Sequence, residues 1–303
     1  AGPLRLTARD LSSKNGTYYQ SARIASVELP LTGAVLTLGD SAVAIVPDDD
    51  LLEVASERAL SGGRMVGQGP EKERLFRQIL RVAPSNATVL IHGETGSGKE
   101  LVAEAIHQHG LRHDKPFVIM DCASIPPALV ESELFGHVRG AFTGATHDRK
   151  GAFVRAHGGT IFIDEIGELD PELQPRLLRV LETGTVKAVG SDHPQTVDVR
   201  VIAASLKSIS EQVRERRFRE DLYYRLAVVE LQVPPLRARL EDLPLLVDHF
   251  LGQLGAPPAS PDSLKVLQSH AWPGNVRELK NTLERCAALA QAGPLVIRRE
   301  DLR

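Results

Sequence analysis

The stretch from Gly93 to Lys99, Gly-Glu-Thr-Gly-Ser-Gly-Lys, has the residue types needed to hold a chain of phosphates. It follows an apolar run at 89–91 and precedes a helical pattern that begins near Glu100. Glycines let backbone N–H groups approach an anion closely at a helix N-terminus, and a lysine adds positive charge for the β- and γ-phosphates. This context favours a nucleotide-binding loop over a glycine-rich turn that binds nothing. The residues expected to line it are Gly93, Glu94, Thr95, Gly96, Ser97, Gly98, Lys99 and Glu100.

Two acidic residues, Asp164 and Glu165, close a second apolar run at 160–163. Such a run also fits a surface turn, but after a phosphate-binding loop it is typical of the strand that completes an ATPase site. We expect Asp164 to hold Mg²⁺ through water and Glu165 to orient or deprotonate the attacking water. Glu100 stands where a serine or threonine usually contacts Mg²⁺. It either reaches the metal through water or occupies the first helical turn, where the dipole favours a carboxylate.

The elements that must position these residues alternate between short apolar runs and helical patterns, which is typical of an α/β fold around a parallel sheet. We expect five strands, at 88–91, 117–120, 160–163, 199–203 and 228–231. Beyond Pro235 the pattern is purely helical, with expected helices at 243–254, 262–270 and 276–292. The sequence therefore predicts a nucleotide-binding α/β domain at 65–234 and a small α-helical lid at 235–303.

The first 64 residues have a different pattern. Residues 1–47 combine short apolar stretches with turn signals such as Asn15-Gly16, and they predict a small β-rich unit. Residues 48–64 begin with three aspartates, continue with a short helical pattern and end in a Ser-Gly-Gly stretch, which predicts a linker.

The composition excludes several classes of function. Hydrophobic residues are 42% and charged residues 25% of the 303 residues, as in an ordinary soluble protein with room for two or three domains. A net charge of -3 and an aromatic content of 4% argue against bulk binding of nucleic acid, so any DNA contact needs another segment. Cys122 and Cys286 lack metal-ligand spacing, and no apolar run reaches the ~18 residues of a membrane span. We therefore expect a reduced, cytoplasmic protein with no membrane partner.

Five motifs occur in order between residues 65 and 303: GETGSGKE at 93–100, GAFTGA at 140–145, GGTIFIDE at 158–165, FREDLYYRL at 218–226 and WPGNVREL at 272–279. Together they resemble the AAA+ domain of bacterial sigma-54-dependent transcription activators. The resemblance implies an AAA+ P-loop NTPase that uses ATP and Mg²⁺. It also implies a homo-oligomeric ring of six or seven subunits, whose ATP hydrolysis remodels the closed promoter complex of sigma-54 RNA polymerase into the open complex.

The hexapeptide GAFTGA lies in an insertion between the second and third expected strands. By resemblance it contacts sigma-54, chiefly through Phe142 and Thr143. Glycines at both ends permit unusual backbone angles, and an exposed phenylalanine needs a partner or packs back on its own domain in some nucleotide states. The residues assigned to this contact are Gly140, Ala141, Phe142, Thr143, Gly144 and Ala145.

Three arginines acquire roles only through the resemblance. Arg219 and Arg225 would each reach the γ-phosphate in a neighbouring subunit, so that activity depends on protein concentration; their spacing alone fits a solvated helix equally well. Arg277 resembles the nucleotide-sensing arginine of the lid.

Two positions depart from the family pattern. Asp121 stands where many relatives carry an asparagine that partners the glutamate equivalent to Glu165, and two ionised carboxylates repel each other. We therefore expect the switch at Glu165 to use water, a raised pKa or a different partner. Leu206 stands where an asparagine commonly follows the fourth strand, which leaves nucleotide sensing there in question.

Residues 9–18 and 36–40 resemble the second half of a forkhead-associated (FHA) domain, a phosphothreonine-binding β-sandwich whose earlier strands this chain lacks. A partial β-sandwich and an Asn-Gly hairpin that only turns the chain remain alternatives. The resemblances imply a longer protein, with a phosphothreonine partner for the intact FHA domain and a C-terminal domain for promoter or enhancer DNA. Two rival interpretations are a regulatory nucleotide switch with negligible turnover and an AAA+ unfoldase or helicase loader.

Overall fold

The computed structural model describes residues 6–10, 16–19, 22–29, 34–38, 41–45, 65–289 and 295–302. The chain divides into two compact units, residues 1–61 and 62–303. The helix expected within the linker, at 51–60, lies outside the described residues.

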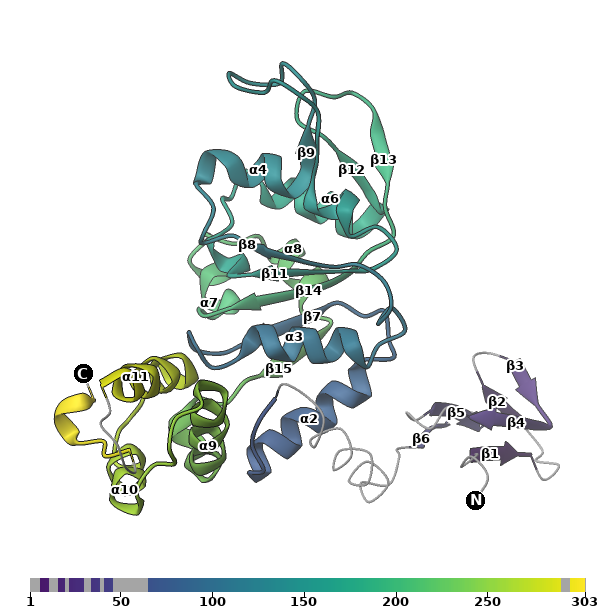
Figure 1. Cartoon of the computed structure of the whole chain (residues 1–303). Coiled ribbons are helices and arrows are strands. Elements are labelled where there is room, and N and C mark those ends of the chain that lie inside the picture. The colour runs from purple at the N-terminus through teal and green to yellow at the C-terminus, as the bar shows by residue number, and fades with distance from the viewer. Residues whose placement is uncertain are drawn as a thin grey trace. The chain divides into compact units, whose positions relative to one another are not determined.

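The larger unit is built around a five-stranded parallel sheet (Figure 1). The spatial order is β15-β7-β14-β11-β8. The bounds are β7 (Val89–His92), β8 (Phe117–Asp121), β11 (Thr160–Asp164), β14 (Arg200–Ser205) and β15 (Val229–Gln232). The predicted fold class and all five strands are confirmed. The largest difference is at β14, which continues to Ser205 because that residue is buried and pairs with His92 of β7.

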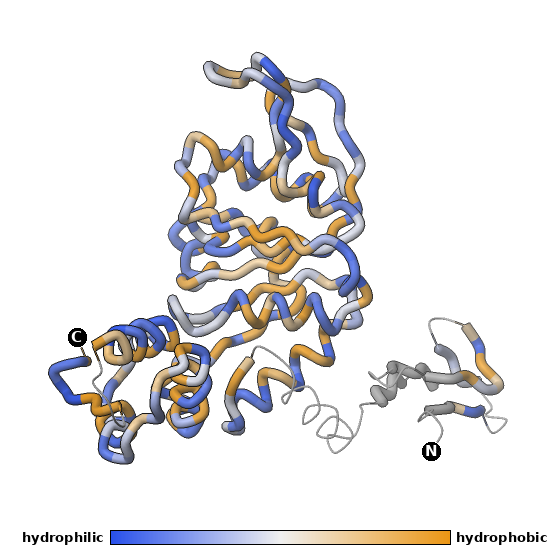
Figure 2. The backbone as a smooth tube through the Cα atoms, in the orientation of Figure 1, coloured by the Kyte–Doolittle hydropathy of each residue, from blue (hydrophilic) through white to orange (hydrophobic). Residues whose placement is uncertain are grey.

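Helices cover the sheet, and the middle residues of its central strands are apolar (Figure 2). All six residues of β14 and the first four of β11 are buried, as expected for parallel strands with both faces covered. The helices of this layer are α2 (Pro70–Val82), α3 (Lys99–Gln108), α4 (Pro127–Phe135), α5 (Ala152–Arg155), α6 (Gln174–Thr183), α7 (Ile209–Arg214) and α8 (Glu220–Leu226), with a 3-10 turn η1 (Ile166–Glu168).

A smaller helical layer forms its own core around Trp272, which is fully buried. It contains η2 (Leu236–Ala238), η3 (Leu240–Asp242), α9 (Leu243–Leu254), α10 (Pro261–Gln268), α11 (Asn275–Leu289) and η4 (Arg299–Asp301). The predicted lid helices are confirmed. α10 begins one residue early because the Ser260 side chain caps it by accepting from the Ser263 N–H at 3.2 Å. The last predicted residues of the third helix, 290–292, lie outside the described part.

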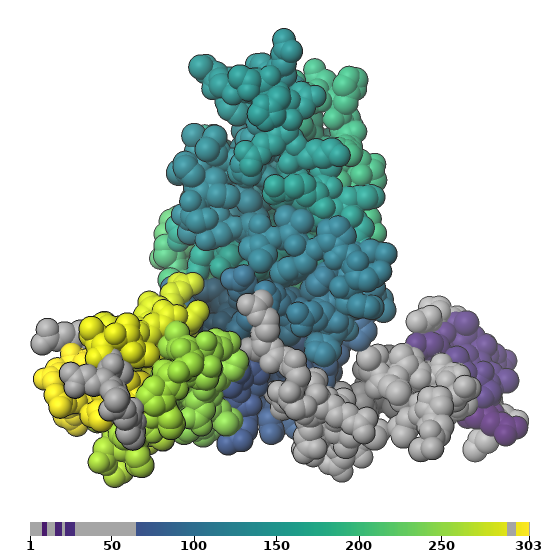
Figure 3. All heavy atoms as spheres, in the orientation of Figure 1, coloured from purple at the N-terminus to yellow at the C-terminus, as the bar shows by residue number. Residues whose placement is uncertain are grey.

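Two short hairpins extend from the sheet at the top of the view in Figures 1 and 3. One pairs β9 (Gly136–His137) with β10 (Arg149–Lys150), and the other pairs β12 (Thr185–Lys187) with β13 (Pro194–Thr196). The Val138 N–H donates to the Val189 carbonyl at 3.1 Å, so the hairpins support each other. The first hairpin agrees with the predicted insertion between the second and third strands, whereas the second hairpin is absent from the predicted elements.

The described residues of the N-terminal unit form antiparallel strands, in agreement with the predicted β-rich unit. β1 (Leu6–Arg9) pairs with β4 (Ser26–Leu29). The order of the other sheet is β3-β2-β5-β6, with β3 (Ala22–Ile24), β2 (Thr17–Tyr19), β5 (Ala34–Leu38) and β6 (Ser41–Ile45). Asn15 of the expected turn lies outside the described residues, while Gly16 has a φ of 76°. Within the described part of the chain, no helix has the length and apolar character of a membrane span.

Candidate nucleotide site and exposed loop

The predicted phosphate-binding loop connects β7 to α3. Gly96 and Gly98 have φ angles of 74° and 107°, which glycine adopts without the steric cost of a side chain. Lys99 is the first residue of α3 and is buried; its Nζ donates to the Gly93 carbonyl at 3.0 Å and to Glu165 Oε1 at 3.1 Å. Lys99 therefore connects the phosphate loop to the acidic end of β11.

The predicted acidic pair lies at the carboxyl edge of the sheet. Asp164 ends β11 and is in register with Asp121, which ends β8. Burial raises the pKa of Asp164, the Lys99 charge opposes that change, and the Glu165 and Asp121 carboxylates add to it. Glu165 has φ 50° and ψ 48°, a left-handed conformation that is uncommon for residues with side chains. The backbone turn at Glu165 thus places its carboxylate toward Lys99.

Glu165 also reaches the neighbouring strand. Its Oε2 accepts from the Leu206 backbone N–H at 2.9 Å. Asp121 instead accepts from the N–H groups of Ala123 and Ser124, at 2.9 and 3.3 Å, and closes the turn after β8. Of the three alternatives expected for Glu165, the structure shows a different partner. The contact at Leu206 uses a backbone N–H, so the absence of an asparagine side chain does not remove it.

A lid residue that the sequence analysis missed closes over the loop. Asn275 is buried at the start of α11, and its Nδ2 donates to Glu94 Oε2 at 3.0 Å and to the Thr95 carbonyl at 3.1 Å. Arg237 forms an ion pair with Glu94, with Nη1 donating to Oε2 at 2.8 Å. The Arg237 and Asn275 hydrogen bonds lower the pKa of Glu94 to about 2. Asn275 lies inside the WPGNVREL motif, which was the available signal.

Two further lid arginines reach the loop. The N–H of Arg277 lies 3.4 Å from the Gly96 carbonyl, and a Cβ added at Gly96 would lie 2.8 Å from the Arg277 Cβ. The structure thus places predicted Arg277 at the loop. Arg239, which the sequence analysis missed, is buried and donates from Nη2 to the Ser97 carbonyl at 2.8 Å.

The segment that enters this unit, residues 65–69, is fixed by buried charges. Asp242 is fully buried, and its Oδ1 accepts from the N–H groups of Gln68 and Gly69, both at 2.6 Å. Lys72 donates to the Gly67 carbonyl at 3.0 Å. Burial lowers the pKa of Lys72 to about 8, although the Asp242 charge opposes that change. One turn, from Arg239 to Asp242, thus contacts both the entry segment and the phosphate loop.

The remaining predicted ATPase residues do not join this cluster within one chain. Arg219 forms a two-point ion pair with Asp221, at 3.0 and 2.7 Å. Arg225 donates to the Leu181 carbonyl at 3.3 and 3.1 Å. Glu100 is exposed in the first turn of α3. Arg219 is the N-cap residue of α8 and Arg225 lies within that helix. Both are solvent-exposed, so they remain available to another molecule.

The GAFTGA residues form the tip of the β9–β10 hairpin. Gly140 and Gly144 have φ angles of 82° and 100°, and the Gly140 N–H donates to the Ala145 carbonyl at 2.8 Å. Thr143 is exposed, whereas Phe142 is 39% exposed and lies edge-on against the His137 ring, with centroids 5.0 Å apart. Phe142 therefore packs partly back on its own domain.

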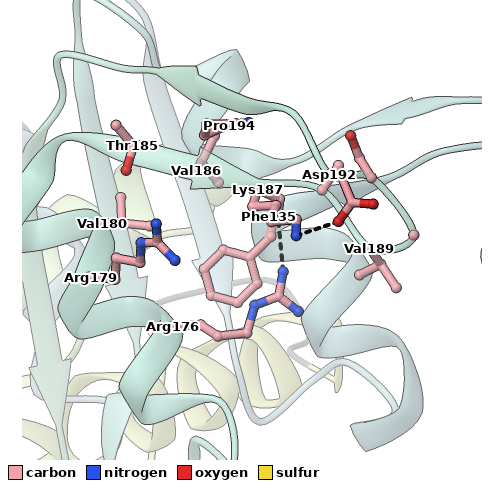
Figure 4. A pocket seen from close by; sticks show the side chains of 13 residues that line it. Phe135, Arg176, Arg179, Val180, Thr185, Val186, Lys187, Val189, Asp192 and Pro194 are labelled. Atoms are coloured by element: carbon pink, nitrogen blue, oxygen red, sulfur yellow. Dashed lines mark hydrogen bonds and ion pairs between the residues drawn. The ribbon is translucent and has the colours of Figure 1, made fainter.

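A cavity of about 420 Å³ lies beside the second hairpin, between the end of α4, α6 and β12–β13 (Figure 4). Arg176 lies over the Phe135 ring at 4.6 Å and pairs with Glu131, and Lys187 pairs with Asp192 at 2.8 Å. These cations thus have partners within the chain. The cavity borders the hairpin that supports the loop and is separate from the nucleotide site.

Comparison with known proteins decides the family. Residues 65–232 match the model of the sigma-54 interaction domain, and residues 237–303 match that of the AAA+ ATPase lid domain. The chain belongs to the sigma-54 interaction domain family.

Curated relatives of this sigma-54 interaction domain protein include transcriptional regulators. It is 49% identical to a Nif-specific regulatory protein of Azotobacter vinelandii, over 76% of this chain and 45% of the relative. It is also 49% identical to the regulatory protein ZraR of Salmonella typhimurium, over 78% of this chain and 55% of the relative. The chain thus spans about half the length of the curated relatives it matches.

A solved structure supports the fold. The chain resembles NtrX from Brucella abortus in complex with ATP, with a TM-score of 0.73 and 37% identity, over 84% of this chain and 60% of that one. NtrX in complex with ADP gives the same TM-score and identity. The AAA+ P-loop NTPase fold predicted from the sequence is therefore confirmed.

Proposed function

We propose that this chain is the ATP-hydrolysing domain of a sigma-54-dependent transcription activator, which remodels the closed promoter complex through the GAFTGA loop. One observation carries the proposal: the tip at Phe142 and Thr143 is presented on a hairpin of a domain whose Lys99 contacts both the phosphate loop and Glu165. An output loop and a hydrolytic site thus occur in one AAA+ unit.

The chemistry follows from the site. The backbone N–H groups of 94–98 and the Lys99 ammonium bind the β- and γ-phosphates of ATP. Asp164 would hold Mg²⁺, because its half-buried carboxylate has a raised pKa that a cation would offset. Bound Mg²⁺ would neutralise charge on the phosphates. When Lys99 turns to the phosphates, the Glu165 oxygen that it contacted becomes free to orient the attacking water. The second oxygen of Glu165 stays hydrogen-bonded to the Leu206 N–H.

The ring supplies the missing positive charge. Arg219 and Arg225 stabilise charge on the γ-phosphate of a neighbouring subunit, so a hexameric or heptameric ring is the active form. Arg219 at the N-cap of α8 and Arg225 within α8 are exposed, and their partners lie away from the phosphate loop, which supports action between subunits.

The partners are sigma-54 and its RNA polymerase in the cytoplasm. A domain outside this chain binds promoter or enhancer DNA, and an FHA module that includes residues 1–47 regulates the ATPase through a phosphothreonine partner. The antiparallel strands of the N-terminal unit support a β-sandwich fragment.

Retention of sigma-54 tests the loop assignment. Wild-type protein loaded with ADP and aluminium fluoride, which mimic the transition state, should retain sigma-54, and protein without nucleotide should not. Thr143→Ala should lose retention yet keep its ATPase activity, because Thr143 is exposed on the hairpin tip, away from the phosphate loop. Equal retention by Thr143→Ala and wild type would show that the loop is not the contact.

A further inference from the structure

We propose that His137 is a positioning residue that seats Phe142 against the domain and so holds the output loop in its retracted form. The inference rests on the proposed function of the loop for its consequence at sigma-54. We call the contact of the His137 ring with Phe142 the seat. The seat itself is a property of this chain.

His137 is held in place by a hydrogen bond to α4. Its ring is buried, with 7% of the residue exposed, and Nδ1 lies 2.6 Å from the hydroxyl of Ser132, which is also buried. Ser132 is on α4, whereas His137 is on β9, so this hydrogen bond ties the hairpin to the helix before it. A buried polar pair of this kind resists separation, because each group loses its partner without gaining water.

His137 in turn supports Phe142. The two ring planes meet at 67° with centroids 5.0 Å apart, the edge-to-face arrangement that aromatic rings favour. This contact leaves Phe142 39% exposed, so the seat covers the ring only in part. Such a contact is strong enough to bias the loop and weak enough to be exchanged for a better apolar partner.

The β12–β13 hairpin also contacts His137. His137 forms a parallel bridge with Val189, and the Val189 N–H donates to the Gly136 carbonyl at 2.8 Å. A Cβ added at Gly190 would lie 2.7 Å from the Ala141 Cβ, so the loop rests on this hairpin beside the seat. The residues at 188–190 also border the cavity of Figure 4.

The seat is connected to the acidic end of the sheet by short steps. Asp121 pairs in register with Asp164 and closes the turn that leads into α4. α4 carries Ser132, which holds His137. A shift of α4 would therefore pull on the seat directly, and Phe142 would be released when Ser132 and His137 separate.

Hydrogen exchange of the loop amides tests this seat without sigma-54. The amides to follow are Gly140 and Ala145, which donate to the Ala145 and Phe142 carbonyls within the loop. In nucleotide-free protein, His137→Ala should raise their exchange rates about tenfold, and Ser132→Ala should raise them by about fivefold, because each removes one restraint on the loop. Ser132→Ala removes only a hydroxyl from a helix, so it serves even if the histidine variant folds poorly.

His147→Ala is the matched control. It removes a second imidazole, whose centroid is 6.4 Å from that of His137 but which is exposed, so exchange at the loop should stay as in wild type. Unchanged exchange in both seat variants, or an equal increase in the control, would overturn the inference.

The consequence for sigma-54 is measured separately. With the seat removed, nucleotide-free Ser132→Ala should retain several-fold more sigma-54 than nucleotide-free wild type, while its ATPase activity stays unchanged. Faster exchange together with no sigma-54 retention by any variant, even with the transition-state mimic, would support the seat and contradict the proposed function. Faster exchange with wild-type retention in the nucleotide-free state would overturn the claim that the seat restrains output.

Discussion

At the scale of single residues, the proposed role of Glu165 depends on the two contacts of its carboxylate. Its carboxylate is shared between Lys99 and the Leu206 N–H, at 3.1 and 2.9 Å. Both contacts depend on the left-handed backbone at Glu165, which is uncommon and is maintained by the surrounding structure. Under the proposed mechanism, the γ-phosphate would compete for Lys99 and thereby free one carboxylate oxygen for water.

Glu165→Gln tests this role. The amide keeps the size of the side chain but cannot accept a proton, so ATP should still bind while kcat falls about a hundredfold or more. Steady-state ATPase assays and equilibrium nucleotide binding measure the two effects. Asp121→Asn is the matched control, because its side-chain oxygen still accepts from the turn N–H groups and turnover should stay within a few-fold. A loss of turnover in the control equal to that in Glu165→Gln would contradict the assignment.

The site residues that the sequence predicts are those that belong to a local sequence pattern. The loop from Gly93 to Lys99 and the acids after 160–163 are local patterns. Asn275 and Arg239 were missed because their contacts with the loop join residues more than 140 positions apart. No spacing rule reports such contacts, since they depend on how the lid packs on the sheet.

At the scale of elements, the turn from Arg239 to Asp242 joins three segments. Arg239 contacts the phosphate loop, Asp242 holds the entry segment at Gln68 and Gly69, and Lys72 on α2 completes the buried charge cluster. The lid and the start of the domain are thus held by one set of groups. We therefore expect a change in either segment to alter the packing of the phosphate loop.

The pH dependence of stability tests this cluster. The pKa of Lys72 is lowered from 10.5 to about 8 in the folded chain, so between these pH values the unfolded chain binds more protons than the folded one. Stability contributed by this residue should therefore rise with pH from about 8 to 10.5. The quantity to measure is the unfolding free energy of wild type minus that of Lys72→Met. Denaturant titrations at several pH values across this range give it. A flat or falling difference would contradict the buried position of Lys72.

Elements with strong periodicity were predicted well, and short ones were not. The three inner strands β7, β14 and β11 are mainly apolar, which burial on both faces explains, whereas the edge strands β15 and β8 are partly exposed. The β12–β13 hairpin was not predicted because its strands have three residues each and β13 is exposed throughout. Its position is set by the contact with the β9–β10 hairpin, which the local sequence does not encode.

At the scale of the whole molecule, the proposed activity requires more than one subunit for each active site. The phosphate loop, the acids and the lid residues come from one chain, whereas Arg219 and Arg225 have partners elsewhere on α8 and α6. Under the proposed mechanism, the arginine that stabilises transition-state charge would therefore come from a neighbouring subunit. Opening of a promoter would then depend on assembly.

Mixing two inactive variants tests the central claim, that a ring which hydrolyses ATP opens the promoter complex. Lys99→Ala lacks a working phosphate loop but keeps its arginines, and Arg219→Ala has the reverse defect. Each alone should fail to hydrolyse ATP and to open a sigma-54 promoter. In an equimolar mixture about a quarter of the sites combine an intact loop with an intact neighbouring arginine, so both activities should return in part. Full activity of Arg219→Ala alone, or a mixture that stays inactive although both variants fold and assemble, would contradict the account.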